Sequence, residues 1–93
     1  MGANEARHVL AMVDDLGKVL ALELMTAAQA LDLRVRMVEG EAHPGRAVAA
    51  AHAAIRERIA FLDRDRALDG DVRAALALVD DGTVLAAVRA ATP

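Results

Sequence analysis

The sequence contains no cysteine, serine, tryptophan or tyrosine, and Phe61 is its only aromatic residue. Without cysteine the chain can form neither a disulfide nor a thiolate metal site, and without serine it also lacks the other common nucleophile. No two of its three histidines are three or four residues apart, so they lack the spacing of a metal site on one helix. The residues therefore indicate no catalytic, cofactor-binding or metal-binding position.

Long apolar runs and a strong excess of charge are also missing, and we expect no leader sequence. No apolar run approaches the roughly 18–20 residues that cross a membrane, and the first residues lack the apolar centre of a signal peptide. The formal net charge is −3 and no basic run occurs, which argues against nucleic acid as a partner. We therefore expect a cytoplasmic protein that binds neither a membrane nor nucleic acid.

Alanine, leucine and valine supply most of the apolar residues, and alanine alone makes up about a quarter of the chain. Alanine and leucine favour helices over strands. A chain of 93 residues forms at most one domain, and its core is small if it stands alone. We predict an all-α fold with one long helix and three or four short helices, forming part of a larger helical bundle.

The long bundle helix is predicted over residues 4–34, where apolar residues surround most of the circumference. The main stripe recurs at steps of three and four residues: Val9, Val13, Leu16, Leu20, Leu24, Ala27 and Leu31. A second apolar strip consists of Met12, Val19, Leu22 and Leu33, and a narrow polar strip includes Asp14, Lys18, Gln29 and Asp32. Such a helix would be roughly 46 Å long, whereas a compact globule of this size is only about 30 Å across. We therefore expect this helix to be buried in a larger assembly.

The remainder of the chain is predicted to cover the end of this helix. A connector at residues 35–46 contains two glycines and a proline. Short covering helices then occupy residues 47–89, with the first two at about 47–59 and 71–79. Residues 1–93 would thus form a single helical segment.

Capping residues set the expected ends of these helices. Asn4 is the predicted N-cap of the long helix, and Asp69 that of the helix at residues 71–79. Gly82 is expected to end that helix in the left-handed conformation, and Thr83 to cap the last short helix. Asp63 could cap one further short turn.

Glu23 is the most informative polar residue, because it lies among apolar positions and has no basic neighbour one helical turn away. A buried carboxylate needs a partner, so we interpret Glu23 as half of a salt bridge between helices or between subunits. Its predicted partners within the chain are Arg56, Arg58 and Arg66, and an arginine of another subunit is equally possible. The alternatives are a direct role in chemistry and simple exposure to solvent.

Further polar residues are interpreted as structural. Gln29 is expected to make a hydrogen bond between packed helices, with a ligand contact as the alternative. Asp65 and Arg66 are expected to form an ion pair and cap that stabilises the fold. Gly17 costs about 1 kcal/mol relative to alanine in a helix interior, so we expect another helix to approach closely there. The histidines are interpreted as solvated side chains.

Three segments of the sequence resemble a known family in order and spacing. They read VLALEL and AAQALDLR within residues 19–34, IRERI and FLDRDR within 55–66, and DV, LV and GTVLAAV within 71–88. Together they resemble the C-terminal segment of the histidine ammonia-lyase and aromatic amino acid ammonia-lyase family, and they cover nearly all of the chain.

The resemblance implies a segment of a homotetrameric enzyme that removes ammonia from an α-amino acid, as in the conversion of histidine to urocanate. In this family a methylidene-imidazolone cofactor forms from an Ala-Ser-Gly turn, and an acidic residue lies in a Gln-Glu-Asp-His stretch. Neither sequence occurs here, nor does any tyrosine, so no catalytic residue of the family can be carried over. Met1 would be internal to a longer protein. We expect this chain to be inactive alone, with the remainder of the lyase or copies of itself as partners.

Other interpretations remain open. The parent could act on histidine or on aromatic amino acids, as a lyase or as an aminomutase. The chain could instead be a free-standing helical oligomerisation module whose long helix pairs with its own copy. A small helical enzyme such as a chorismate mutase is a weaker alternative, because it would need several cations facing a pocket, and the only lysine lies on the polar strip.

Overall fold

The computed structural model describes residues 2–38, 40 and 42–93, and these residues form helices and no strand. The helices are α1 (Gly2–Met37), α2 (Arg46–Arg56), α3 (Asp69–Asp81) and α4 (Thr83–Ala91). The predicted all-α class is therefore confirmed for the described residues. Met1, which we expected to be internal to a longer chain, and residues 39 and 41 of the expected connector lie outside the described residues.

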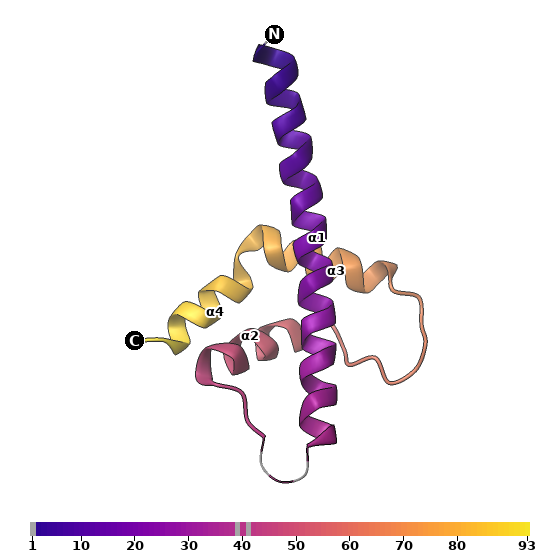
Figure 1. The fold of residues 1–93 in the computed structure, drawn as a ribbon, viewed down its shortest axis with the longest axis vertical. Helices are drawn as coiled ribbons and strands as arrows, with labels where there is room; N and C mark the ends of the chain where they lie inside the picture. The colour runs from indigo at the N-terminus through magenta and orange to yellow at the C-terminus, as the bar shows by residue number, and fades with distance from the viewer. Residues whose placement is uncertain (1, 39, 41) are drawn as a thin grey trace.

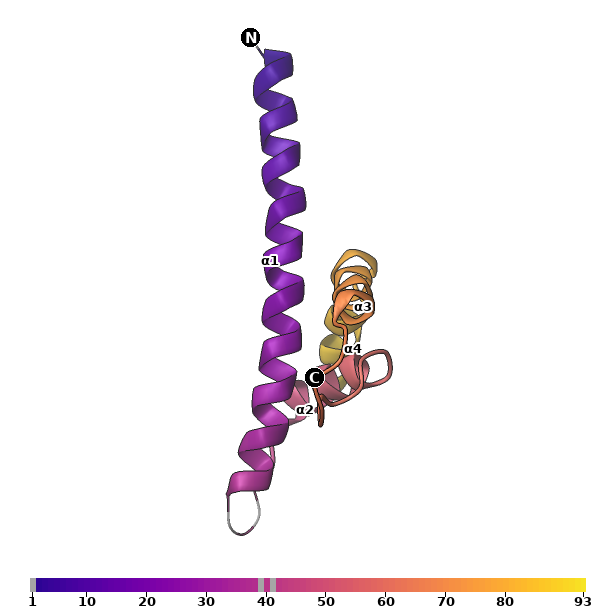
Figure 2. The ribbon, with the colours of Figure 1, turned by 90° about the vertical axis from the view of Figure 1, so that its right-hand side faces the viewer.

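α1 forms the long axis of the molecule, and the other three helices lie beside its C-terminal half (Figure 1). A view turned by 90° shows that all three lie on one side of α1, while its N-terminal part projects beyond them (Figure 2). The principal extents are 59 × 38 × 19 Å. The radius of gyration is 15.9 Å, compared with about 12 Å for a compact chain of this length. The chain is therefore far more extended than a domain that encloses its own core.

A small core forms where α1 meets α2 and α3. Its buried members are Ala21, Ala28, Ile55, Ile59, Ala75 and Leu78. α1 contributes only alanines to this core, and such short side chains let a neighbouring helix approach closely. α2 packs in turn against α4, which returns over it after the turn that follows α3. The residues of α1 before Gly17 are all exposed and take no part in this packing.

The main stripe predicted for α1 packs within the chain only towards its C-terminal end, where the half-buried Leu24 lies against the core. Val9, Leu16 and Leu20 on this stripe are 52%, 56% and 40% exposed. The second strip is exposed too, with Met12 at 61% and Val19 at 50%. The fully buried residues of α1 are the small Ala21 and Ala28, which carry little hydrophobic signal in a sequence. The apolar periodicity predicted the helix correctly, but it could not show which face of the helix packs against the rest of the chain.

Several predicted caps are displaced. Asn4 lies inside α1, which begins at Gly2. α3 begins at Asp69 itself, and Leu68 is its N-cap. Gly82, with φ 71°, has the predicted left-handed conformation and joins α3 to α4. The short helical turn expected after Asp63 is not found among the described residues. Residues 57–68 form an irregular loop there.

The single chain leaves an unusually large surface exposed. Its accessible area is 6854 Å², whereas a folded monomer of 9.8 kDa exposes about 5,200 Å². On the polar strip of α1, Lys18 pairs with Asp15 at 3.7 Å and not with Asp14. None of the helices in the described part of the chain has both the length and the apolar character needed to cross a membrane.

Candidate functional site

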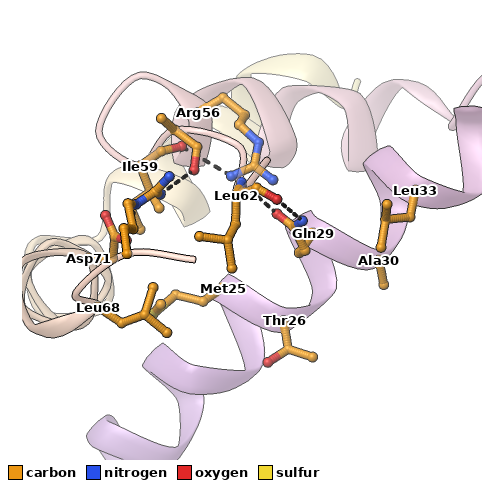
Figure 3. A pocket seen from close by; sticks show the side chains of 12 residues that line it. Met25, Thr26, Gln29, Ala30, Leu33, Arg56, Ile59, Leu62, Leu68 and Asp71 are labelled. Carbon is orange, nitrogen blue, oxygen red and sulfur yellow. Dashed lines mark hydrogen bonds and ion pairs between the residues drawn. The ribbon is translucent and has the colours of Figure 1, made fainter. Parts of the chain in front are cut away.

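The loop at residues 57–68 is fastened to α1 by a side chain. Gln29 Nε2 donates a hydrogen bond to the carbonyl oxygen of Leu62 at 2.9 Å, and the Leu62 N–H donates to Gln29 Oε1 at 3.0 Å. Figure 3 shows the amide and Leu62 facing each other across this contact. We expected Gln29 to bond to another helix, and the structure corrects this, because its partner is the backbone of a loop.

Asp32, one turn after Gln29, joins α1 to α2. Arg56 Nε donates a hydrogen bond to Asp32 Oδ2 at 2.8 Å, and Arg56 Nη2 lies 2.6 Å from the same oxygen. His52 Nε2 lies 3.0 Å from it, and none of the three side chains is more than 25% exposed. Burial acts to raise the pKa of Asp32, but the contacts with His52 and Arg56 outweigh it, and the pKa falls below its ordinary value of 3.8. His52 is therefore not the solvated histidine that we expected.

Arg66 ties the end of the loop to α3. Its Nε donates to Asp71 Oδ2 at 3.1 Å, while Nη1 donates to the Phe61 carbonyl oxygen at 3.2 Å and Nη2 to that of Ala60 at 2.8 Å. The predicted Asp65–Arg66 pair is thus wrong, because Arg66 reaches back across the loop while Asp65 is exposed. Arg66 therefore binds Asp71 in place of Asp65. Asp71 lies in the first turn of α3, where the helix dipole also favours a carboxylate.

The single aromatic side chain connects the loop to the end of α1. The guanidinium carbon of Arg36 lies 3.8 Å from the centroid of the Phe61 ring, and that of Arg56 lies 6.0 Å away. An arginine over an aromatic face is attracted to the electron density of the ring. The loop is therefore held by contacts that come from α1, α2 and α3.

An open apolar groove of about 320 Å³ lies between α1 and this loop (Figure 3). Its apolar lining includes Met25, Ala30, Leu33, Ile59, Leu62 and Leu68. The charged groups at its edge are Arg56, Arg66 and Asp71, and each already binds a partner within the chain. A charged ligand would have to break these pairs, so the groove suits an apolar side chain of another segment better than a small charged molecule.

The junction of α3 and α4 holds a second charged cluster. Arg58 Nη1 donates to Asp81 Oδ2 at 2.8 Å, and the hydroxyl and N–H of Thr83 donate to Asp81 Oδ1 at 2.6 and 2.9 Å. The hydrogen bonds from Thr83 and then Arg58 lower the pKa of Asp81 from 3.8 to about 2. Thr83 is the first residue of α4 and does not cap it, because Gly82 is the N-cap.

Glu23 is exposed in the single chain, and it borders an open hollow that Leu78 and Val79 of α3 and Val84 of α4 also line. Among the described residues it has no ion-pair partner. The partners predicted within the chain bind elsewhere, since Arg56 pairs with Asp32, Arg58 with Asp81 and Arg66 with Asp71. The expectation of burial and pairing within the chain is therefore corrected, and a basic partner from another chain stays a prediction. Around Glu23 the surface of α1 is an apolar depression lined by Val19, Leu22, Thr26, Ala27 and Ala30.

Sequence reasoning missed the contact between Asp32 and Arg56. We placed Asp32 on the exposed polar strip, because its carboxylate follows the same face as Asp14 and Lys18. The sequence did contain a signal for this contact. Gln29 and Asp32 are three residues apart and therefore share one face of α1. They continue the polar strip into the part of α1 that the other helices cover. Within the described residues no three His, Asp or Glu side chains lie close enough together to hold a metal ion.

The described chain is thus a helical segment in which a polar network fixes a loop and a long helix has an exposed apolar surface. The sequence model of the aromatic amino acid lyase family matches residues 1–57, and the chain belongs to this family. No solved structure matches the chain.

The similar proteins include lyases with different named substrates. A histidine ammonia-lyase from Anaeromyxobacter sp. (strain K) is 44% identical over 88% of this chain and 15% of its own length. A histidine ammonia-lyase from Sorangium cellulosum is 41% identical over 98% of this chain and 17% of its own length. A tyrosine ammonia-lyase from Cupriavidus metallidurans is 40% identical over 98% of this chain and 16% of its own length. The chain thus spans about one sixth of the length of these relatives.

Proposed function

We propose that this chain is a structural, C-terminal segment of an ammonia-lyase of the histidine ammonia-lyase type, and that it is inactive alone. The observation that carries the proposal is the exposed apolar surface of α1, where large side chains such as Val9, Met12 and Leu16 are more than half exposed. Each such side chain forfeits about 1.5–3 kcal/mol when it stays in water. A helix of this kind is stable inside a larger assembly, and relatives six times as long would supply it.

The parent activity would be the non-oxidative removal of ammonia from an α-amino acid, in the cytoplasm. Histidine, giving urocanate, is the first candidate, because several of the similar proteins are named histidine ammonia-lyase. The relative named tyrosine ammonia-lyase keeps tyrosine as a second candidate. The residues of this chain do not fit the methylidene-imidazolone cofactor, because the chain contains no serine and therefore no Ala-Ser-Gly turn. The chain's contribution would be to pack, and to hold the loop at residues 57–68 in place.

Two assays test this proposal. The purified chain, incubated with histidine and with tyrosine, should produce no absorbance of urocanate or coumarate. The Sorangium cellulosum relative should then be produced without the 91 residues that match this chain. Co-expression with this chain should restore its activity, whereas a variant with Leu16→Arg on the apolar face should not, and Lys18→Glu on the polar strip should. Turnover by the chain alone, or no restoration by the unchanged chain, would contradict the proposal.

The second candidate is a free-standing helical oligomerisation module without catalytic activity. The same exposed surface of α1 favours it, because a second copy could cover that surface as well as a lyase could. The co-expression assay separates the two candidates, since an independent module would associate with itself but restore nothing.

A further inference from the structure

Asp32 is approached by more donors than one of its oxygens can accept. Arg56 Nε, Arg56 Nη2 and His52 Nε2 lie 2.8, 2.6 and 3.0 Å from the single atom Asp32 Oδ2. Of these nitrogens only Arg56 Nε meets the oxygen in hydrogen-bond geometry, whereas the other two are buried and make no hydrogen bond among the described residues. A carboxylate oxygen accepts about two hydrogen bonds. His52 and Arg56 therefore compete for one acceptor.

The two competitors belong to different apolar hollows. His52 lines an open hollow of about 510 Å³ between α1 and α2, together with residues such as Leu31 and Ala51. Arg56 borders the groove of about 320 Å³ between α1 and the loop at residues 57–68. The Asp32 carboxylate thus connects a residue of one hollow to a residue of the other.

Arg56 also holds the beginning of the loop. Its Nη1 donates a hydrogen bond to the carbonyl oxygen of Ile59 at 3.1 Å, and its guanidinium carbon lies 6.0 Å from the centroid of the Phe61 ring. Next to Phe61, the Leu62 N–H donates to Gln29, which lies one turn before Asp32 on α1. A shift of the Arg56 guanidinium therefore moves the part of the loop that Gln29 holds.

We propose that Asp32 is a conformational switch for which His52 and Arg56 compete, and that the outcome sets how firmly the loop is held. When His52 turns towards its hollow, the carboxylate is left to Arg56, whose planar guanidinium can bind both oxygens at once. The loop is then held more firmly. When His52 takes the shared oxygen, Arg56 loses a partner and the loop opens more often. The inference goes beyond the proposed function and does not depend on it.

The sign of one substitution distinguishes competition from a simple bond between helices. If His52 only joined α1 to α2, its removal would loosen this junction and the loop beside it. If His52 competes with Arg56, its removal tightens the loop. His52→Leu makes the distinction, because leucine is also large but has no hydrogen-bond donor on its side chain.

Amide exchange at Leu62, followed by NMR in the full chain, measures how often the loop opens, because the hydrogen bond of this N–H crosses from the loop to α1. We expect His52→Leu to slow this exchange at least threefold and Asp32→Asn to speed it at least fivefold. The Ala86 N–H, which is hydrogen-bonded in the first turn of α4, should change by less than twofold in both variants.

Two matched variants separate competition from other effects. Ala51→Val adds apolar bulk to the hollow that His52 lines but removes no donor. Asp15→Asn makes the same chemical change as Asp32→Asn on the same helix, at an exposed pair with Lys18. Each should leave exchange at Leu62 within twofold of the wild-type rate.

The double variant completes the test. In the Asp32→Asn background, His52→Leu should no longer slow exchange at Leu62, because no ionised carboxylate is left to compete for. Equal slowing in both backgrounds would overturn the inference, as would faster or unchanged exchange in His52→Leu alone, or equal slowing by Ala51→Val. If Asp32→Asn does not fold, the sign of the effect of His52→Leu alone decides.

Discussion

Gln29 and Leu62 exchange two hydrogen bonds across 33 residues of sequence, with the side-chain amide of Gln29 meeting both polar groups of the Leu62 backbone. The Gln29 amide thereby makes the pair of hydrogen bonds that the backbone of a neighbouring strand would make in a sheet. The loop at residues 57–68 has no secondary structure of its own, so this contact decides where its backbone lies on α1.

Replacing Gln29 should therefore destabilise the fold. Gln29→Ala would leave a half-buried N–H and carbonyl of Leu62 without partners, at a cost of about 2 kcal/mol. Thr26→Ala is the matched control, because the Thr26 hydroxyl bonds only to the Leu22 carbonyl of its own helix and is exposed. We expect it to cost under about 0.5 kcal/mol. Denaturant unfolding at a fixed protein concentration measures both, and equal effects would show that the loop is not held by Gln29.

Removing Asp32 should be costly at neutral pH. Asp32→Ala would leave Arg56, only 17% exposed, without its carboxylate, and should lower the free energy of unfolding by about 2 kcal/mol. Asp14→Ala on the exposed strip should change it by under about 0.5 kcal/mol.

The effect of Asp32 should also depend on pH. The pKa of Asp32 is lower in the folded state than its ordinary value of 3.8, so its ionised form stabilises the fold. This stabilisation is fully present above that ordinary value and is lost as the pH falls through the lowered pKa. The difference between wild type and Asp32→Asn should therefore shrink in unfolding experiments at pH 3 relative to pH 7. A constant difference would mean that the carboxylate charge plays no part.

The pKa of Asp81 can be measured directly by NMR titration of its carboxyl carbon. We expect a value of about 2, because the hydrogen bonds from Thr83 and Arg58 favour the ionised form. Thr83→Val removes the hydroxyl donor and should raise the pKa towards its ordinary value of 3.8. An unchanged pKa in the variant would assign the shift to Arg58 instead.

Replacing Gly17 and Gly82 with alanine should change the stability of the fold in opposite directions. A Cβ at Gly17 would lie 3.7 Å from Leu76 Cδ1, an ordinary contact, so Gly17→Ala should stabilise α1 by about 1 kcal/mol. Gly82 has φ 71°, where a side chain is strained, so Gly82→Ala should destabilise the fold by roughly 1–2 kcal/mol. Thermal unfolding would show Tm shifts of opposite sign. A loss of stability in Gly17→Ala would indicate a closer neighbour on α1 than Leu76.

The sequence predicted the helices well because their signals are local. The periodic apolar pattern located α1, and the glycine at position 82 located the break between α3 and α4. The contacts of the loop were not predicted, because they join residues far apart in sequence, as when Gln29 meets Leu62. Arg66 illustrates the same limit, since its neighbour Asp65 was the obvious partner but Asp71 is the one that it binds.

The apolar periodicity also could not show which face of α1 packs against the other helices. Ala21 and Ala28 are the fully buried residues of α1 at its contact with the other helices, whereas Leu24 and Met25 are only partly buried there and Leu16 is exposed. A hydrophobic pattern ranks side chains by size and polarity, whereas packing between helices depends on how closely their axes approach. Glu23 was recognised as unusual, but its exposure in the single chain could be seen only once the other helices were placed.

The projection of α1 beyond the other helices divides one continuous helix into two parts of different local stability. Amides near its N-terminus, such as that of Val9, are protected by helical hydrogen bonds alone, whereas those near Ala21 also depend on the opening of the core. In the isolated chain, hydrogen–deuterium exchange should therefore be fast near the N-terminus and should slow steadily towards the segment that α3 covers. A partner beside this part of α1, as proposed above, would slow the exchange of its amides.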